Sequence, residues 1–309
     1  MKKIRLFCPA TVANLSCGFD ILGLCLENIG DEMVISKTEK PGVRITRITG
    51  GELPFETEKN VAGVAALAML AQWQTDFGFE IEIDKKIRTG SGIGSSAASA
   101  AGAVFGINEL LGRPFDPKDL VWFAGWGENL ASGSYHADNV APALLGGFTL
   151  IRGYDPIDII RIESPPELIV VIIHPKIEVK TAEARAILKQ EVALKTAIAQ
   201  WGNVGGLIAG LYTNDYDLIG RSLHDGVAEP YRKKLIPGFD DAKKAALAHG
   251  ALGAGISGSG PSIFALCRGI AKAESVATAM RAVYDKIGVG YDAYISPVNP
   301  DGIKILDKR

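Results

Sequence analysis

The sequence contains few of the residues from which metal centres and disulfide frameworks are built. Among its 309 residues are four cysteines and four histidines. The cysteines, Cys8, Cys17, Cys25 and Cys267, show neither CxxC spacing nor the dense pattern of a small secreted domain. No two histidines share the HExxH spacing of a zinc site. The sequence therefore predicts reduced thiols and no zinc centre.

Long apolar runs and a large excess of charge of one sign are also lacking. No apolar run approaches the roughly 20 residues needed to span a bilayer. The formal net charge of −2 gives no reason to expect nucleic acid or an anionic membrane as a partner. Lys2 and Lys3 imitate the start of a signal peptide, but Pro9, Asn14 and Ser16 interrupt the apolar stretch and no clear cleavage signature follows. We therefore expect a cytoplasmic protein without a nucleic-acid or membrane partner.

What the chain does contain is enough apolar material for two cores. Hydrophobic residues make up 47% of its 309 residues, as in an ordered chain with two medium-sized domains. Strand and helix patterns are mixed without a strict βαβ rhythm, which favours an α+β fold over a doubly wound sheet. Pro156, Pro165 and Pro166 punctuate a stretch of short strands. We place the domain boundary there, with a first domain at 1–155 and a second at 156–309.

Periodicity and breaker residues locate the expected elements. Asn60 is an expected helix cap, and Pro117 is expected in the first turn of a helix. Strands are expected near 3–8, 21–27, 33–37, 43–46, 79–84, 148–151, 168–173 and 291–295. Helices are expected near 60–73, 97–111, 116–131, 181–188, 191–211, 214–224, 239–249 and 272–286, with a strand–loop–strand at 252–267.

The strongest local signal is the glycine–serine loop from Gly90 to Ser96, between an expected strand and an expected helix. Three glycines at alternate positions let the backbone bend so that several N–H groups converge on one spot. The positive end of the following helix would stabilise an anion there without a lysine. Ser95 and Ser96 can donate to phosphate oxygens or present a hydroxyl to Mg²⁺. A tight turn that only allows close packing is the alternative.

Two familiar phosphate motifs do not fit this loop. A Walker A loop requires a lysine after its last glycine, and none is present. In a Rossmann fingerprint the third glycine would come one residue later than Gly94. A GxGxxG does run from Gly253 to Gly258, but strand-like residues follow where that fingerprint requires a helix.

Two further groups of polar residues are candidates for the same site. Glu128, on an expected helix, could hold Mg²⁺ together with Ser96, and His136, Asp138 and Asn139 lie on the adjoining loop. The alternative is a solvated helix residue followed by an Asx turn.

The other group suits a small charged substrate. Asn14 and Asp20, on a polar loop near the amino terminus, offer an amide and a carboxylate. Arg185 and Arg232 could pair with a substrate carboxylate, although a lone arginine is more often a surface residue.

Taken together, these segments resemble the three signatures of the GHMP kinase superfamily, in order, at 9–23, 90–98 and 253–261. Within it, the sequence is most similar to the homoserine kinase family. That family's motifs PA-x-x-AN-x-x-x-GFD-x-LG, E-x(3)-SG-x-x-H-x-DN, T-x-x-AR and YR-x-x-LIPG all have counterparts here. Arg88 and Ile93 depart from the usual form of the glycine loop.

The resemblance implies a ribosomal-protein-S5-like first domain, a ferredoxin-like second domain and an active site between them. It implies phosphorylation of the L-homoserine hydroxyl by ATP with Mg²⁺, a step toward threonine. The implied ATP-binding residues are Arg88, Thr89, Gly90, Ser91, Gly92, Ile93, Gly94, Ser95, Ser96, Ala97 and Ala98. The implied Mg²⁺ ligands are Ser96 and Glu128. The implied substrate-binding residues are Asn14, Asp20, His136, Thr181, Arg185, Arg232 and Gly258.

The catalytic residues would then be Ser96, Glu128, Asp138 and Asn139. Homoserine kinases are thought to lack a suitably placed general base, so our hypothesis is that Asn139 orients the hydroxyl and that Asp138 is not a base. A homodimer is expected from the base rate for soluble enzymes. Three alternatives remain: a kinase of the same fold acting on mevalonate, shikimate or a sugar, a ligand sensor without turnover, and an interaction protein with an S5-like domain.

Overall fold

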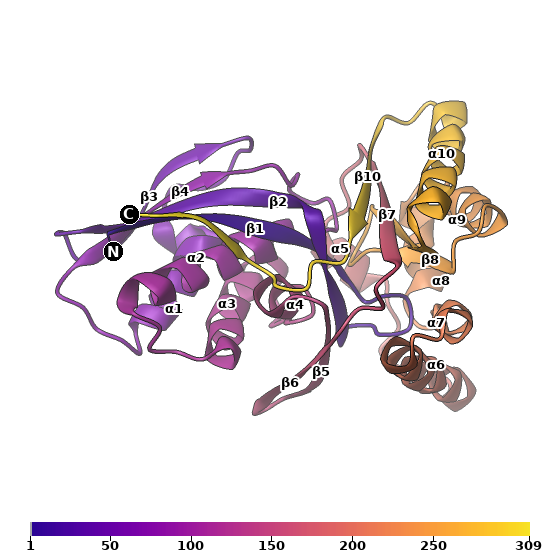
Figure 1. Cartoon of the computed structure of the whole chain (residues 1–309), viewed down its shortest axis with the longest axis horizontal. Helices are drawn as coiled ribbons and strands as arrows, with labels where there is room; N and C mark the ends of the chain where they lie inside the picture. Colours follow the sequence, from indigo (N-terminus) through magenta and orange to yellow (C-terminus); the bar gives the residue numbers. More distant parts are fainter. Residues whose placement is uncertain (1) are drawn as a thin grey trace.

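The computed structural model describes residues 2–309, except for the side chain of Ser132. Within this range the chain forms two sheets side by side, each covered by helices (Figure 1). The larger sheet has seven strands, in the order β11-β1-β2-β4-β3, with the β5–β6 hairpin attached to β2 in the part of the chain that is described. Its strands are β1 (Lys3–Ala13), β2 (Leu22–Thr38), β3 (Gly42–Thr49), β4 (Gly78–Asp84), β5 (Phe148–Tyr154), β6 (Ile157–Ile162) and β11 (Lys304–Lys308).

Helices α1 (Val61–Leu70), α2 (Ser95–Leu111), α3 (Pro117–Ser132) and α4 (Val140–Leu145) cover one face of this sheet (Figure 1). The sequence confines α2 to the interior, because its side chains are nearly all small or aliphatic and almost all are buried. Small residues allow close approach to the strands: a Cβ at Gly106 would lie 2.4 Å from Ile35 Cδ1.

Local signals correctly predicted two of these helix starts. Asn60 accepts a hydrogen bond from the N–H of Ala62 and so caps α1. Asp116 forms a reciprocal capping box with Asp119, and Pro117 stands at the first position of α3.

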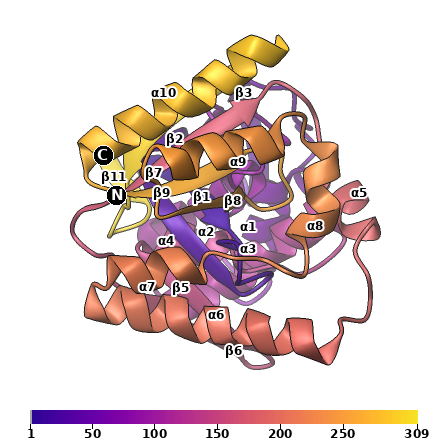
Figure 2. The ribbon, with the colours of Figure 1, turned by 90° about the vertical axis from the view of Figure 1, so that its right-hand side faces the viewer.

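The smaller sheet is antiparallel, in the order β10-β7-β9-β8. Its strands are β7 (Leu168–Pro175), β8 (Gly253–Ile256), β9 (Ile263–Arg268) and β10 (Tyr291–Pro297). Its helices are α5 (Thr181–Ala186), α6 (Leu194–Thr213), α7 (Tyr216–Ser222), α8 (Glu229–Arg232), α9 (Phe239–Ala248) and α10 (Ile270–Ile287), and 3₁₀ turns lie at Thr57–Lys59 and Lys233–Leu235. Helices α9 and α10 lie on one side of this sheet and α6 and α7 on the other (Figure 2).

Side chains along β7 alternate between the two faces of the sheet, and this explains the arrangement of the helices. Val171 and Ile173 pack in the core beneath α9 and α10, whereas Val170 and Ile172 join the core that continues into the first domain. One apolar cluster therefore spans both domains.

Several of the expected bounds of domains and strands were wrong, because they depend on pairing between strands that are distant in the sequence. The boundary placed between residues 155 and 156 falls in the turn of the β5–β6 hairpin, so β6 belongs to the first sheet. The last strand, β11, also returns to the first sheet and pairs with β1. The strands expected at 21–27 and 33–37 are one continuous strand, β2, because β1 pairs with it along most of its length. Pro9 lies inside β1, next to a register shift, so this strand continues past its expected end at residue 8.

In the described part of the chain, no helix combines the length and the apolar character that crossing a membrane would require.

Candidate active site

The glycine–serine loop adopts the left-handed backbone that its glycines allow. The φ angles are +71° at Gly90, +79° at Gly92 and +72° at Gly94, and α2 begins at the next residue, Ser95. Among residues 2–309, no side chain caps the start of α2. The first N–H groups of a 17-residue helix are therefore available to an anion at this point.

A second glycine-rich segment, 257–262, lies against this loop from the smaller sheet. Ser257 Oγ donates to the carbonyl of Gly92 at 2.7 Å, and Ser262 Oγ donates to the carbonyl of Ser91 at 2.6 Å. A Cβ at Gly92 would lie 2.5 Å from the carbonyl oxygen of Gly260, so only glycine fits there. The GxGxxG at 253–258 is followed by β9 and not by a helix, as predicted, and it shapes the site from the second domain.

A buried ion pair supports the loop from below. Lys85 Nζ pairs with the carboxylate of Asp31 and donates to the carbonyl of Ser95 at 2.8 Å and to Ser99 Oγ at 3.2 Å. Sequence reasoning missed this pair. The signal was present, because Phe79, Ile81, Ile83 and Lys85 alternate along one face and so place the lysine toward the core.

A cavity of about 410 Å³ opens beside the loop and is lined by both domains. Seventeen of the predicted site residues line it, namely Asn14, Asp20, Thr89, Gly90, Ser91, Gly92, Gly94, Ser95, Ser96, Glu128, His136, Asp138, Asn139, Thr181, Arg185, Arg232 and Gly258. Four predicted ATP-binding residues do not line it: Ile93, Ala97 and Ala98 are buried in the core, and Arg88 is exposed. Glu178, Val179 and Lys180 also line the cavity and were not predicted.

Glu128 and Ser96 face each other at the end of this cavity that is formed by the glycine–serine loop. The carboxyl group of Glu128 is buried, and burial raises its pKa to about 7 against the opposing effects of the hydrogen bond from Ser96 and of nearby Lys85. A buried carboxylate beside a hydroxyl is a suitable pair of ligands for a hard divalent cation, which would restore the ionised form. The residues present therefore fit a Mg²⁺ ion.

A charged cluster occupies the other end of the cavity. Arg185 Nη2 donates to both carboxylate oxygens of Asp20, each at 2.7 Å. Arg232 is buried and donates to the carbonyl oxygens of Gly258 and Ala184, each at 3.0 Å. The ring of Phe19 lies under both guanidinium groups, with centroid distances of 5.5 and 5.0 Å.

Two nitrogens of this cluster have no protein partner. Within the described part of the chain, the buried Nε2 of His136 and Nε of Arg185 make no hydrogen bond. The Nδ1 of His136 lies 3.9 Å from Asp20, and burial lowers the pKa of this histidine. Buried polar atoms usually have partners, so these two nitrogens are candidates for contact with a ligand.

The loop that carries Asn14 and Asp20 is held in an unusual conformation. Asn14, Leu15, Ser16 and Asp20 all have positive φ angles. Asn14 Oδ1 accepts the N–H of Asp20 at 2.9 Å, and its Nδ2 donates to the carbonyl of Gly258 at 2.8 Å. Asn14 thus fixes the loop and ties it to the second domain.

Asn139 and Asp138 lie between the two ends of the cavity. Thr11 Oγ1 donates to Asn139 Oδ1 at 2.7 Å, which fixes the orientation of the amide. Sequence reasoning assigned no role to Thr11. Asp138 is buried, and its pKa rises to about 7, first through burial and then through the charges of Asp20 and Glu128.

Comparisons with known proteins agree with this geometry. Residues 60–147 match the GHMP kinases N terminal domain, and residues 207–286 match the GHMP kinases C terminal family. The chain is 49% identical to homoserine kinase of Chloroherpeton thalassium over 319 residues, which cover 99% of this chain and 100% of the relative. It is 40% identical to homoserine kinase of Xanthomonas campestris, with coverage of 99% and 95%.

The chain belongs to the homoserine kinase family. A crystal structure of homoserine kinase from Cytophaga hutchinsonii superimposes with a TM-score of 0.95 at 53% identity, covering 99% of this chain and 98% of that one. An L. major mevalonate kinase matches with a TM-score of 0.69 at 16% identity and so shares the fold. The two-domain GHMP kinase fold predicted from the sequence is confirmed, and the chain is a kinase of a family that uses ATP.

Proposed function

We propose that this chain transfers the γ-phosphoryl group of ATP to the side-chain hydroxyl of L-homoserine, giving O-phospho-L-homoserine for threonine synthesis. The observation that carries the proposal is that one cavity joins an anion-binding helix start to a carboxylate–guanidinium cluster. A neutral sugar would have no use for the cluster of Asp20, Arg185 and Arg232. Membership of the homoserine kinase family supports the same substrate.

The charged cluster suits the zwitterionic end of homoserine. Asp20 would accept the ammonium group, and Arg185 and Arg232 would pair with the carboxylate. Without substrate, Arg185 and Asp20 pair with each other, so neither charge is left without a counter-charge near the cavity. The ammonium group of homoserine can take the place of Arg185 beside Asp20, and its carboxylate can take the place of Asp20 beside Arg185. The unpartnered nitrogens of His136 and Arg185 can form further hydrogen bonds with the substrate.

At the other end, the loop from Gly90 to Ser96 would hold the phosphates of ATP. Ser96 and Glu128 would hold Mg²⁺, which when bound neutralises charge on the phosphates. Glu128 is suited to this role because its buried carboxylate is otherwise costly to ionise. The start of α2 supplies backbone N–H groups, and Lys180 offers a positive charge on the cavity wall.

Between these ends, Asn139 would orient the hydroxyl, with its amide fixed by Thr11. We propose that Asp138 is not a general base. Phosphoryl transfer with a loose transition state needs little activation of the nucleophile, so positioning and charge neutralisation suffice.

A coupled assay of ADP release, with homoserine, mevalonate, shikimate and galactose as acceptors, tests the substrate. Selective turnover of homoserine is expected. Arg232→Lys should raise KM for homoserine by about tenfold to a hundredfold, because a lysine cannot reproduce the paired N–H groups of a guanidinium. Arg47→Lys, on the outer strand β3, is the matched control and should change nothing. Selective turnover of another acceptor would refute the substrate assignment.

We also propose a cytoplasmic homodimer. Leu194, Ile198, Trp201 and Tyr212 on α6 are between 52% and 69% exposed and recur at spacings that place them along one side of the helix. An apolar row of this kind suits contact with a second copy of the chain. Light scattering should give twice the mass of the chain, and Trp201→Glu should give the monomer. A monomeric parent protein would contradict the proposal.

A further inference from the structure

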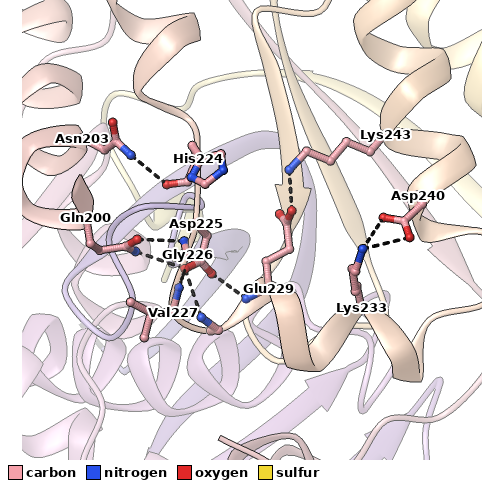
Figure 3. A network of polar contacts seen from close by, with 11 residues as sticks. Gln200, Asn203, His224, Asp225, Gly226, Val227, Glu229, Lys233, Asp240 and Lys243 are labelled. Atoms are coloured by element: carbon pink, nitrogen blue, oxygen red, sulfur yellow. Dashed lines mark hydrogen bonds and ion pairs between the residues drawn. The ribbon is translucent and has the colours of Figure 1, made fainter. Parts of the chain in front are cut away.

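A buried polar cluster lies outside the cavity, at the start of the helix that carries Arg232. Asp225 is 8% exposed, and its carboxylate accepts four hydrogen bonds. Three come from the backbone N–H groups of Val227, Ala228 and Glu229, at 2.7, 3.0 and 2.8 Å (Figure 3). Asp225 thus fixes the backbone that leads into α8, where Arg232 is the last residue.

The fourth hydrogen bond joins this cluster to α6. Gln200 Nε2 donates to Asp225 Oδ1 at 3.1 Å, and Gln200 Oε1 accepts the N–H of Gly226 at 3.0 Å (Figure 3). The same Nε2 also donates to the carbonyl of Cys17 at 2.8 Å. Cys17 lies in the loop between Asn14 and Asp20, so one amide side chain joins that loop to the segment before α8.

A second hydrogen-bonded link joins the loop to α8, beside the contact between the Phe19 ring and the guanidinium of Arg232. The carbonyl of Gly258 accepts from Asn14 Nδ2 at 2.8 Å and from Arg232 Nη1 at 3.0 Å. Hydrogen-bonded ties at Gly258 and at Gln200 therefore connect the part of the chain that carries Asp20 with the part that carries Arg232. Two separated ties restrict both the distance between the loop at 14–20 and α8 and the rotation of one relative to the other. A single hydrogen bond would restrict only the distance.

From this geometry we propose that Gln200 and Asp225 are positioning residues that set the separation between Asp20 and Arg232. This inference rests on the proposed function, in which these two groups bind the ammonium and the carboxylate of one substrate. A fixed separation favours a substrate whose two charges are borne by one carbon atom. Gln200 and Asp225 therefore act on substrate selectivity, without touching the substrate.

The test is a steady-state comparison of Gln200→Met with Asn203→Leu. Methionine keeps the length of the side chain and removes all three hydrogen bonds. Asn203 is the matched control, because it lies on the same helix and donates to the carbonyl of His224 at 3.3 Å, in the segment just before Asp225 (Figure 3). It makes no hydrogen bond to the loop at 14–20 among the described residues.

Three acceptors distinguish the binding of both charged groups together from the binding of either group alone. They are homoserine, 4-hydroxybutyrate, which lacks the ammonium group, and 3-aminopropan-1-ol, which lacks the carboxylate. In Gln200→Met, KM for homoserine should rise by about tenfold or more, up to the roughly hundredfold cost that a misplacement of about 1 Å can reach. The value of kcat and KM for ATP should stay within about twofold, because the lost interaction is uniform binding of one substrate. The kcat/KM for each analogue should change little, so the preference for homoserine falls by about tenfold or more.

A second variant, Gln200→Glu, keeps the acceptor for Gly226 but loses both donors, and the same pattern is expected from it. Asn203→Leu should behave as the parent. Unchanged kinetics in both Gln200 variants, or an equal loss for homoserine and the two analogues, would overturn the inference. Failure of the parent protein to phosphorylate homoserine would instead refute the proposed function, so the two failures are distinguishable.

Discussion

Replacing Glu128 by glutamine should stabilise the protein while it destroys activity. Glu128 lies on α3 and faces Ser96 at the start of α2, and burial raises the pKa of its carboxyl from the ordinary 4.5 to about 7. One pKa unit corresponds to about 1.4 kcal/mol, so ionised Glu128 costs the folded protein about 3 kcal/mol. Glutamine has nearly the same shape and carries no charge, so it removes this cost.

The size of this stabilisation depends on pH. Because the pKa of this acid is higher in the folded state, the folded protein binds the proton more tightly than the unfolded chain does. The parent therefore loses stability as pH rises from about 4.5 to 7. Glu128→Gln should match the parent at pH 4 and exceed it by about 3 kcal/mol at pH 8.

Urea unfolding at the two pH values measures this difference. Glu52→Gln, at an exposed position, is the control and should show no pH-dependent gain. Turnover of Glu128→Gln should fall by about a hundredfold or more, because a neutral amide is a poor Mg²⁺ ligand. Mg²⁺ with ADP should stabilise the parent more than the variant. Equal stability of parent and variant at pH 8 would refute the reasoning.

Three further variants test the support of the site. Gly92→Ala should destabilise the protein by about 2 kcal/mol and weaken ATP binding, because its Cβ would meet the carbonyl of Gly260 at a φ of +79°; urea unfolding and nucleotide titration measure the two effects. Lys85→Met should cost about 3–5 kcal/mol by leaving Asp31 buried and unpaired, and adding Asp31→Asn should recover most of this; no recovery would contradict the pairing. Asp138→Asn should keep kcat within about tenfold, whereas a loss of about a thousandfold would show that Asp138 is a base.

Much of the site could be predicted because its chemistry is local in sequence. The glycine–serine loop owes its conformation to glycines at alternate positions and to the helix that follows directly. Asp116 and Pro117 likewise act within one helical turn. Residue type and spacing are sufficient to predict such features from the sequence.

Features that depend on pairing between distant segments could not be predicted. The strand β11 joins β1 across some 300 residues of sequence, and no local pattern indicates its partner. The contacts of Gln200 could not be predicted either, because an isolated glutamine on a helix gives no sign that it reaches Cys17 and Asp225. Lys85 is different: the alternation of β4 placed it inward, and a buried lysine requires a partner such as Asp31.

The segment at 257–258 supports the proposal that this kinase acts without a general base. Ser257 Oγ holds the carbonyl of Gly92 in the phosphate loop, and the carbonyl of the next residue, Gly258, holds Asn14 and Arg232 at the homoserine end. Two adjacent residues thus connect the two halves of the proposed reaction. In the proposed reaction, these hydrogen bonds from side chains to backbone carbonyls would fix the distance between the phosphates and the substrate hydroxyl. A positioning mechanism requires such a fixed distance, since placing the reactants correctly can supply about 7–11 kcal/mol of the barrier.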